Sequence, residues 1–372
     1  MGKVILMAVG DTGPLVEPPG TIFEAVKDVL SAADLRFAQV ERTFSTRGTY
    51  QEYSLGRHSR VPPHLVSAYS YAGFNVVSLA SNHTCDWGPE PVVDTIEAFR
   101  GREIATVGTG ANIKEARTPA IMEKNGLRIA FLGYNSVLLP QYWATESRPG
   151  CAPVRADTYY RPYEYQPGAP PLVYSVADRQ DLQAMVEDIK GVRPKADVVV
   201  CSFHWGVHFL PRYIADYQIE VAHAAIDAGC DLILGHHAHM IKGMEVYRGK
   251  HCLYSIGNFA LCSPIKAPGT RPLCPPDGKF TIDQVYDIPL GPGRTYSHRE
   301  YLDYTVIVKA ELENNGQVGL TLLPVYVESG PRPTILKPED PRFEEVVKLI
   351  QWSSEPFGTR FELTDGGLRV LG

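Results

Sequence analysis

Short apolar runs that end at polar side chains recur along the 372-residue chain. Residues 3–9, 74–80, 196–203 and 231–234 are runs of this kind, and residues 35–41 form a weaker one. Short apolar runs bounded by glycine or polar residues are typical of buried strands, so the pattern predicts a core strand at each. The polar side chains at or just after their ends are Asp11, Glu41, Asn82, His83, His204, His236, His237 and His239.

Segments with helical spacing alternate with these runs. Residues 21–33, 63–72, 89–100, 178–190 and 215–228 repeat apolar side chains at the spacing that gives a helix one buried face. A chain that alternates strands and helices folds into layers of sheet and helix. We therefore expect an α/β fold in which a layered β-sandwich is flanked by helices, in the order α-β-β-α.

The last part of the chain, residues 304–372, has a different pattern and is expected to be an extension of the core. Residues 304–312 and 318–327 alternate apolar and polar positions around an Asn-Asn-Gly turn. This combination predicts a β-hairpin. Residues 341–351 place their apolar side chains on one helical face, which predicts a helix after the hairpin.

Two stretches break the alternation of strands and helices. Residues 139–174 are crowded with Pro, Tyr and Arg, and residues 261–304 are rich in Pro and Gly. Long segments of this kind in a compact enzyme are commonly lids or binding loops, although surface decoration or an oligomer contact would give the same composition. We expect both stretches to be insertions in a single domain over residues 1–372. We expect them to form the walls of the site. Candidate substrate-binding residues in the first stretch are Tyr142, Trp143 and Arg148.

Residues 235–239, with the sequence Gly-His-His-Ala-His, are the richest segment in candidate metal ligands. Histidine is the commonest ligand for transition metals, and side chains two apart on an extended segment point to one side. The spacing favours His237 and His239 as a pair, while His236, directly after the glycine, stays an alternative. A solvated polar loop would also explain the composition. Together with the oxygen ligands at the other strand ends, the set suits one or two divalent ions of Mn, Zn, Fe or Co.

The order of these motifs resembles that of a known family. Gly-Asp, a buried Glu, Ser-Leu-Ala-x-Asn-His-x-x-Asp-x-Gly, His-Trp-Gly and Gly-His-His-x-His follow one another, and Tyr-Ser-Ile-Gly-Asn-Phe comes after them. This series, over roughly residues 3–260, is similar to the CapA family of poly-γ-glutamate capsule synthesis proteins, which belongs with the calcineurin-like metallophosphoesterases. Several motifs in one order are more specific than any one of them alone.

The resemblance implies a role for each matching residue. The implied metal ligands are Asp11, Glu41, Asn82, His204, His239 and one of His236 and His237. His83 would act as an acid or as a hydrogen-bond donor in the transition state, with Asp86 as a second catalytic residue. Trp205 and Asn258 lie in matching segments and are candidate substrate contacts. The chain departs from the phosphoesterase pattern at Gly13, where the histidine of Asp-x-His is missing, and this removes one ligand from a second metal site.

Composition narrows the classes of partner. A net charge of −6 gives no basic face for nucleic acid, and a mean hydropathy of −0.14 argues against a membrane protein. Residues 1–3 pass directly into the first predicted strand, so we expect no signal peptide, no membrane anchor and a cytoplasmic protein. The seven cysteines show no C-x-x-C pair, so we expect most of them to be reduced.

Three functions fit the sequence. The first is a metal-dependent hydrolase that acts on an ester, lactone, amide or phosphoester in a small-molecule or peptide-like anionic substrate. The second, implied by the resemblance, is an accessory role in poly-γ-glutamate synthesis. The third is a metal- or ligand-binding protein of the same fold without turnover. A homo-oligomer is compatible with each.

Overall fold

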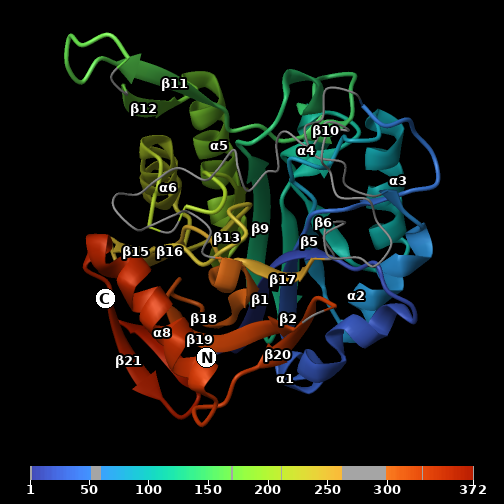
Figure 1. The fold of residues 1–372 in the computed structure, drawn as a ribbon. Helices are drawn as coiled ribbons and strands as arrows, with labels where there is room; N and C mark the ends of the chain where they lie inside the picture. The colour runs from blue at the N-terminus through green and yellow to red at the C-terminus, as the bar shows by residue number, and fades with distance from the viewer. Residues whose placement is uncertain are drawn as a thin grey trace, which may run out of the picture.

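Two β-sheets face each other in the computed structural model, and helices cover their outer sides (Figure 1). The structure describes residues 2–51, 60–168, 171–210, 212–261, 299–328 and 330–371. The first sheet has the order β21-β22-β19-β18-β1-β2-β5-β6, with β17 beside β1 and β20 beside β19. Its strands are β1 (Lys3–Gly13), β2 (Leu35–Val40), β5 (Val76–Ser78), β6 (Ala105–Val107), β17 (Asn258–Leu261), β18 (Tyr304–Glu313), β19 (Val318–Glu328), β20 (Arg332–Ile335), β21 (Arg360–Thr364) and β22 (Gly367–Leu371).

The second sheet has the order β15-β16-β14-β13-β9-β8. Its strands are β8 (Ala120–Lys124), β9 (Leu127–Asn135), β13 (Val198–His204), β14 (Leu232–His236), β15 (Met244–Tyr247) and β16 (Lys250–Leu253). Strands β9, β13, β14 and β16 run parallel. Parallel strands need crossover connections, and helices supply two of these here. The sheet is therefore an α/β layer, as the alternating pattern predicts.

Helices pack on the outer side of each sheet. The first sheet is covered by η1 (Pro19–Val26), α1 (Lys27–Ser31), η2 (Pro63–Val66), α2 (Ser67–Ala72) and α3 (Pro89–Arg100), and the second by α5 (Arg179–Val192), η4 (Arg193–Lys195) and α6 (Asp216–Ala228). The smaller elements are β3 (Thr43–Phe44), β4 (Arg60–Val61), β7 (Thr109–Gly110), α4 (Ile113–Ala116), η3 (Pro140–Tyr142), β10 (Gly150–Cys151), β11 (Ala156–Arg161), β12 (Leu172–Ala177), η5 (Arg299–Asp303), α8 (Pro341–Ser354) and η6 (Glu355–Phe357).

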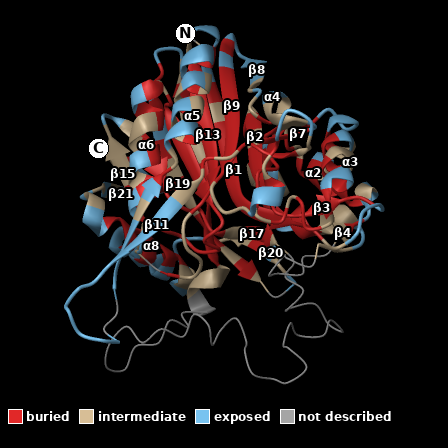
Figure 2. Ribbon diagram, turned by 90° about the horizontal axis from the view of Figure 1, so that it is seen from above, coloured by how far each residue is buried: buried red, intermediate tan, exposed pale blue. Residues whose placement is uncertain are grey.

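Three apolar layers hold these elements together. One fills the space between the sheets, where Phe37 of β2 stacks on Phe131 of β9 with ring centroids 6.0 Å apart. Helix α8 closes this layer with Phe343, Val346 and other apolar side chains. The other two layers lie under the outer helices, and the central strands are buried along their length (Figure 2). The predicted α-β-β-α sandwich is confirmed.

Most predicted elements are present, with one correction. Helix α3 covers the predicted residues 89–100. The segments predicted as helices over residues 21–33 and 63–72 are helical, but each begins as a 3₁₀ helix: η1 is followed by the short α1, and η2 by α2. A 3₁₀ winding aligns residues three apart, and it turns Phe23 and Val26 to the same buried side.

The predicted hairpin is a member of the first sheet. Strands β18 and β19 pair antiparallel, and β18 also pairs antiparallel with β1 along residues 3–8. The segment after residue 304 thus completes the core.

The two predicted insertions differ. Residues 139–174 contain η3 and β10, which lie against the body, and then most of a hairpin formed by β11 and β12. Residues 262–298 of the second insertion lie outside the described part of the chain.

Among the described residues, no helix is long and apolar enough to cross a membrane.

Candidate metal centre

The carboxyl ends of parallel strands from both sheets meet at the candidate centre. Asp11 lies near the end of β1, Glu41 follows β2, and His204 and His236 end β13 and β14. His204 and His236 are direct neighbours in the register of the second sheet. In parallel sheets the carboxyl ends of neighbouring strands lie at one edge, and the face-to-face packing brings the two edges together.

A close approach between two glycines sets the position of Asp11. The Asp11 N–H donates to the Gly257 carbonyl at 3.0 Å, and a Cβ atom at Gly10 would lie 1.9 Å from that oxygen. Gly257 has a φ of 92°, a conformation that other residues adopt at a cost. Glycine at both positions lets β1 lie directly beside the turn into β17, which places Asp11 opposite Asn258.

One histidine nitrogen is crowded by three potential ligands. His204 Nε2 lies 2.8 Å from Asn82 Oδ1, 3.2 Å from His237 Nδ1 and 3.3 Å from Glu41 Oε1. A neutral imidazole nitrogen either donates one hydrogen bond or accepts one. A single hydrogen bond therefore does not explain why an amide oxygen, a carboxylate and a second imidazole all surround His204 Nε2. A cation bound by these groups together would explain it.

Glu41 belongs to two groups of potential ligands. In one group, atoms of Glu41, His204 and His237 lie within 4.8 Å of one another, and in the other, atoms of Asp11, Glu41 and His239 do so. Asp11 and Glu41 are fully buried. Asp11 Oδ1 and Glu41 Oε2 have no hydrogen-bond partner among the described residues. Buried charged oxygens without partners are costly, and a divalent cation would compensate them. The donor set fits one or two such ions, and Glu41 could contribute to either group.

Burial and neighbouring charges shift the pKa of both carboxylates. Burial and the negative charge of Glu41 raise the pKa of Asp11 well above its usual value, although the N–H of His237, 3.2 Å from Oδ2, acts in the opposite direction. Burial also acts to raise the pKa of Glu41, but the imidazoles of His239 and His204 outweigh it and hold that pKa well below its usual value. Burial lowers the pKa of His204 and of His237. Both imidazoles are therefore neutral near pH 7, which is the form that binds metal.

The histidine loop reaches this arrangement by a turn. His237 and His239 have φ values of 83° and 58°, so the assumption that the segment is extended, which favoured this pair, is wrong. The turn nevertheless brings both rings to the carboxylates, and His239 Nδ1 lies 2.8 Å from Asn258 Oδ1. His236 points into the layer between the sheets, 6.1 Å from the ring of Phe37. Its Nδ1 is 3.8 Å from Asp11 Oδ1, and the geometry favours His237 as the ligand.

A chain of polar contacts leads away from His204. Asn82 faces His204 with its oxygen, and its Nδ2 lies 3.2 Å from His83 Nε2. His83 Nδ1 is 2.7 Å from Asp86 Oδ2, and the Tyr142 hydroxyl donates to Asp86 Oδ1 at 2.7 Å. The two predicted catalytic residues are thus in contact. The carboxylate fixes the ring so that Nε2 faces the candidate metal ligands.

Two residues near the centre were missed by the sequence reasoning. The ring of His208 lies 3.8 Å from that of His237 and 5.0 Å from that of His239, measured between centroids. The signal was a further histidine in the loop directly after His204. Lys242 is buried and donates to the carbonyls of Val207 and Tyr213, both at 2.8 Å, so it holds the loop that carries His208. No sequence pattern marks this role.

The predicted substrate contacts are spread over different environments. Trp205 is fully buried, stacks on Phe203 at 4.5 Å and donates to a backbone carbonyl. Tyr142 is also buried and bonded to Asp86. Neither presents a surface to a substrate in this structure. Trp143 and Arg148 are half-buried, and Arg148 donates to the carbonyls of Pro140 and Trp143. Asn258 contacts His239.

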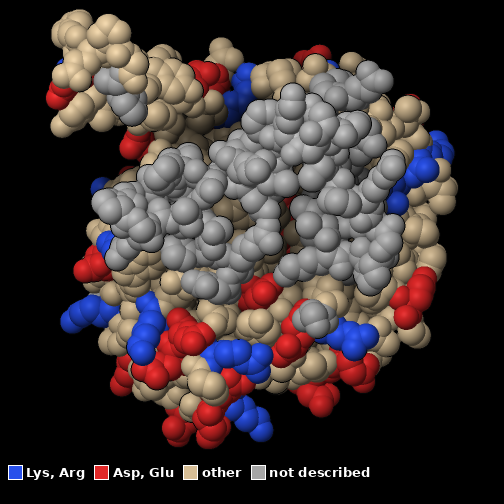
Figure 3. Space-filling model, viewed as in Figure 1, with Lys and Arg blue, Asp and Glu red and all other residues tan. Residues whose placement is uncertain are grey.

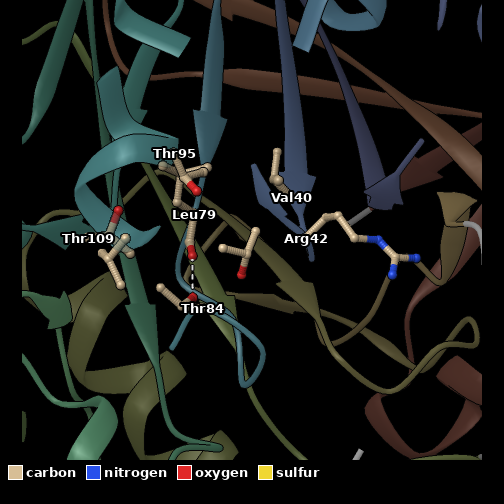
Figure 4. A pocket seen from close by; sticks show the side chains of 8 residues that line it. Val40, Arg42, Leu79, Thr84, Thr95 and Thr109 are labelled. Carbon is tan, nitrogen blue, oxygen red and sulfur yellow. Dashed lines mark hydrogen bonds between the residues drawn. The ribbon is translucent and has the colours of Figure 1, made fainter. Parts of the chain in front are cut away.

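A small cavity lies beside β2 (Figure 4). It has a volume of about 10 Å³ and is lined by Val40, Arg42, Thr43, Leu79, Thr84, Val92, Thr95 and Thr109. This volume holds about one water molecule, and none of the lining residues is a candidate ligand. The Arg42 side chain extends away from it (Figure 4).

A Cβ atom at Gly13 would lie 3.0 Å from Arg42 Nε and 2.8 Å from Leu261 Cδ1. These side chains fill the space beside Gly13, where the sequence lacks the histidine of Asp-x-His.

Comparisons with known proteins identify the same family as the motif order suggested. Residues 10–262, more than half of the chain, match the family described as "Bacterial capsule synthesis protein PGA_cap". The chain belongs to this family. It is 30% identical over 240 residues to "Capsule biosynthesis protein CapA" of Bacillus anthracis, a match that covers 64% of this chain and 53% of the relative. It is 28% identical to "PGA biosynthesis protein CapA" of Bacillus subtilis (strain 168), covering 64% and 56%.

This PGA_cap family member spans about half the length of the curated relatives it matches. Among solved structures, it is similar to a hypothetical protein from Thermus thermophilus, with 16% identity, a TM-score of 0.45 and coverage of 86% of this chain and 97% of that one.

Proposed function

We propose that this PGA_cap family member is a divalent-metal-dependent hydrolase that cleaves an ester, lactone, amide or phosphoester in an anionic substrate. The observation that carries the proposal is Glu41, a fully buried carboxylate shared by two groups of potential ligands. A protein that needed only a folded core would gain nothing from two buried carboxylates beside three imidazoles, because their desolvation is costly without a cation.

Divalent ions held here would lower the pKa of water and polarise the scissile group. The residues that would hold them are Asp11, Glu41, Asn82, His204, His237 and His239. This set mixes carboxylate, amide and imidazole donors, which suits Mn, Zn, Fe or Co.

His83 is the proposed acid for the leaving group. Its Nδ1 is fixed by Asp86, so a proton delivered to the substrate would come from Nε2, which faces Asn82 and the ligands. Asp86 would stabilise the protonated ring by its charge. Tyr142 donates to the second oxygen of Asp86, which holds the carboxylate in the orientation that the ring needs.

The test combines metal analysis with turnover. The purified chain, stripped with a chelator and reloaded with Mn or Zn, is assayed on chromogenic phosphomonoesters, phosphodiesters, lactones, carboxyl esters and a γ-glutamyl anilide. We expect metal to bind and at least one class to be cleaved only in its presence. His83→Ala should keep the metal and lose about 100-fold or more in turnover. Tight metal binding with no cleavage of any class would favour a non-catalytic binding protein.

A second proposal concerns the process served. Two relatives are named as capsule or PGA biosynthesis proteins, and the family carries the same description. We infer that the chain has an accessory role in poly-γ-glutamate synthesis, with a γ-glutamyl amide as the substrate class to test first. Cleavage of the γ-glutamyl anilide in preference to the phosphoesters would support the link, and the reverse preference would separate the hydrolase from capsule synthesis.

A further inference from the structure

Strands β11 and β12 form an arm that stands out from the body of the protein (Figures 1 and 3). Every β11 residue after Ala156 is exposed. The base of the arm is tied to α6, where the N–H groups of Ser175 and Ala177 donate to Asp216 and Glu220. An isolated two-stranded hairpin is marginally stable in water, so an arm whose described contacts with the body lie at its base would gain stability from a further packing partner.

The face of the arm that points away from α6 combines apolar and aromatic side chains with two charged ones, Asp157 and Arg161. The register places Tyr159 opposite Tyr174, and Leu172 and Val176 lie on the same face because they alternate with it. These four side chains are 57%, 43%, 38% and 39% exposed for Tyr159, Tyr174, Leu172 and Val176. The hairpin is also pale along its length in Figure 2. Contiguous exposed apolar side chains mark interaction surfaces more often than isolated ones do.

The outer edge of β11 is available for pairing. Within the described part of the chain, β11 pairs with β12 and with no other strand. An unpaired strand edge presents a row of N–H and C=O groups that another strand can satisfy. Neither Asp157 nor Arg161 forms an ion pair with another described residue. Arg155 is paired with Asp178 and Asp181, and the charge of Asp157 adds to the effect of Asp181 in raising the pKa of Arg155.

We propose that β11 pairs antiparallel with β11 of a second copy of this chain, around a two-fold axis at Tyr159. With this centre, Tyr159 lies opposite Tyr159 of the second copy, and Asp157 lies opposite Arg161. The two-fold symmetry repeats this ion pair, so the contact contains two of them, as an isologous interface requires. The strand is therefore complementary to itself in charge.

The same register builds a row of tyrosines across the joined sheet. Tyr174 pairs with Tyr159 within each hairpin, so the four strands of the two copies carry four tyrosines side by side on one face. Cross-strand aromatic pairs and opposite charges stabilise antiparallel sheets. A centre between Thr158 and Tyr159 would instead turn the tyrosines of the two copies to opposite faces, which loses both the row and the charge pairs.

The size of the contact sets the expected affinity. Standard interfaces bury roughly 1,600 Å², and two six-residue strands with their side chains bury less. We therefore expect a reversible dimer with a dissociation constant in about the micromolar range. Sedimentation velocity of the full chain between about 1 and 100 μM should show a shift from monomer to dimer; a monomer at every concentration would overturn the proposal.

Charge inversion tests the register. Asp157→Arg places two arginines opposite each other at both ends of the contact, and dimerisation should weaken about tenfold or more. Combining it with Arg161→Asp inverts both charges, restores the complementarity and should restore the dimer. The partners of these residues within the hairpin are Val176 and Leu172, which are uncharged, so the hairpin itself keeps its pairing. A dimer unaffected by Asp157→Arg, or not restored by the double variant, would refute this register.

A cysteine pair tests the two-fold axis independently. Tyr159→Cys brings two thiols face to face across the axis, and a mild oxidant such as a copper–phenanthroline complex should link them into a disulfide dimer. Tyr165→Cys is the matched control, because Tyr165 is more exposed but lies in the turn, away from the axis. Rapid linking of Tyr159→Cys alone supports the proposal. Equal linking of both variants would contradict it.

Discussion

Glu41 offers the sharpest test of the metal centre, because it is the residue shared by both groups of potential ligands. Glu41→Gln keeps the size of the side chain and one oxygen but removes the charge. We expect a loss of both ions from the purified protein, measured by elemental analysis, because neither group retains its common carboxylate. A variant of any one other ligand should affect chiefly one group.

The magnitude follows from ligand-linked stability. An ion present at about a thousand times its dissociation constant stabilises the folded chain by roughly 4 kcal/mol. For 372 residues, the unfolding entropy near 60 °C is roughly 0.8 kcal/mol/K, so each ion should raise the Tm by about 5 °C. The Tm difference between metal-loaded and chelator-treated protein should therefore be about 5–10 °C, and Glu41→Gln should reduce it to about 2 °C or less.

The assay is differential scanning fluorimetry with Mn or Zn against EDTA at about pH 8, where His204 and His237, whose pKa burial lowers, are neutral. Glu123→Gln is the control, because Glu123 is an exposed carboxylate in β8 and should leave the metal-dependent shift unchanged. A full shift in Glu41→Gln, together with full metal content, would refute the assignment of a shared carboxylate. A small shift in the unsubstituted chain would mean that the cluster does not bind the ions tested.

Three further variants test other parts of the centre. Asp86→Asn should keep the metal but lower turnover about tenfold or more and change the pH–rate profile, because His83 loses its charged partner; an unchanged profile would contradict the pairing. Burial lowers the pKa of Lys242 to about 7. Above pH 7, Lys242 is therefore still protonated in the unfolded chain but has lost its proton in the folded chain. The free energy of unfolding, measured in urea, should then rise from about pH 7 to 10. Lys242→Met should flatten this rise, and an identical slope would exclude Lys242 as its source. Trp205→Ala should lower the Tm by about 4–6 °C through a core loss of roughly 3–5 kcal/mol with no change in substrate KM, whereas a raised KM at normal stability would restore Trp205 as a substrate contact.

The sequence alone determined the layers and the strand ends that carry the candidate ligands. Apolar runs and helical spacing depend on which face of an element is buried, and this periodicity is written in local residue order. The sandwich, helix α3 and the hairpin of β18 and β19 were therefore predictable. The candidate ligands were also visible, since polar residues that directly follow buried strands stand out from the pattern.

Only the tertiary structure decided how those residues meet. Local spacing did not show that His237 and His239 sit in a turn with positive φ, that Glu41 is shared by two ligand groups, or that Tyr142 and Trp205 are buried. Each depends on contacts between segments far apart in the chain, such as the approach of Gly10 to Gly257 and the hold of Lys242 on the loop after His204. A sequence pattern records whether a side chain is buried or exposed. Which distant atoms it touches is set when the two sheets pack against each other.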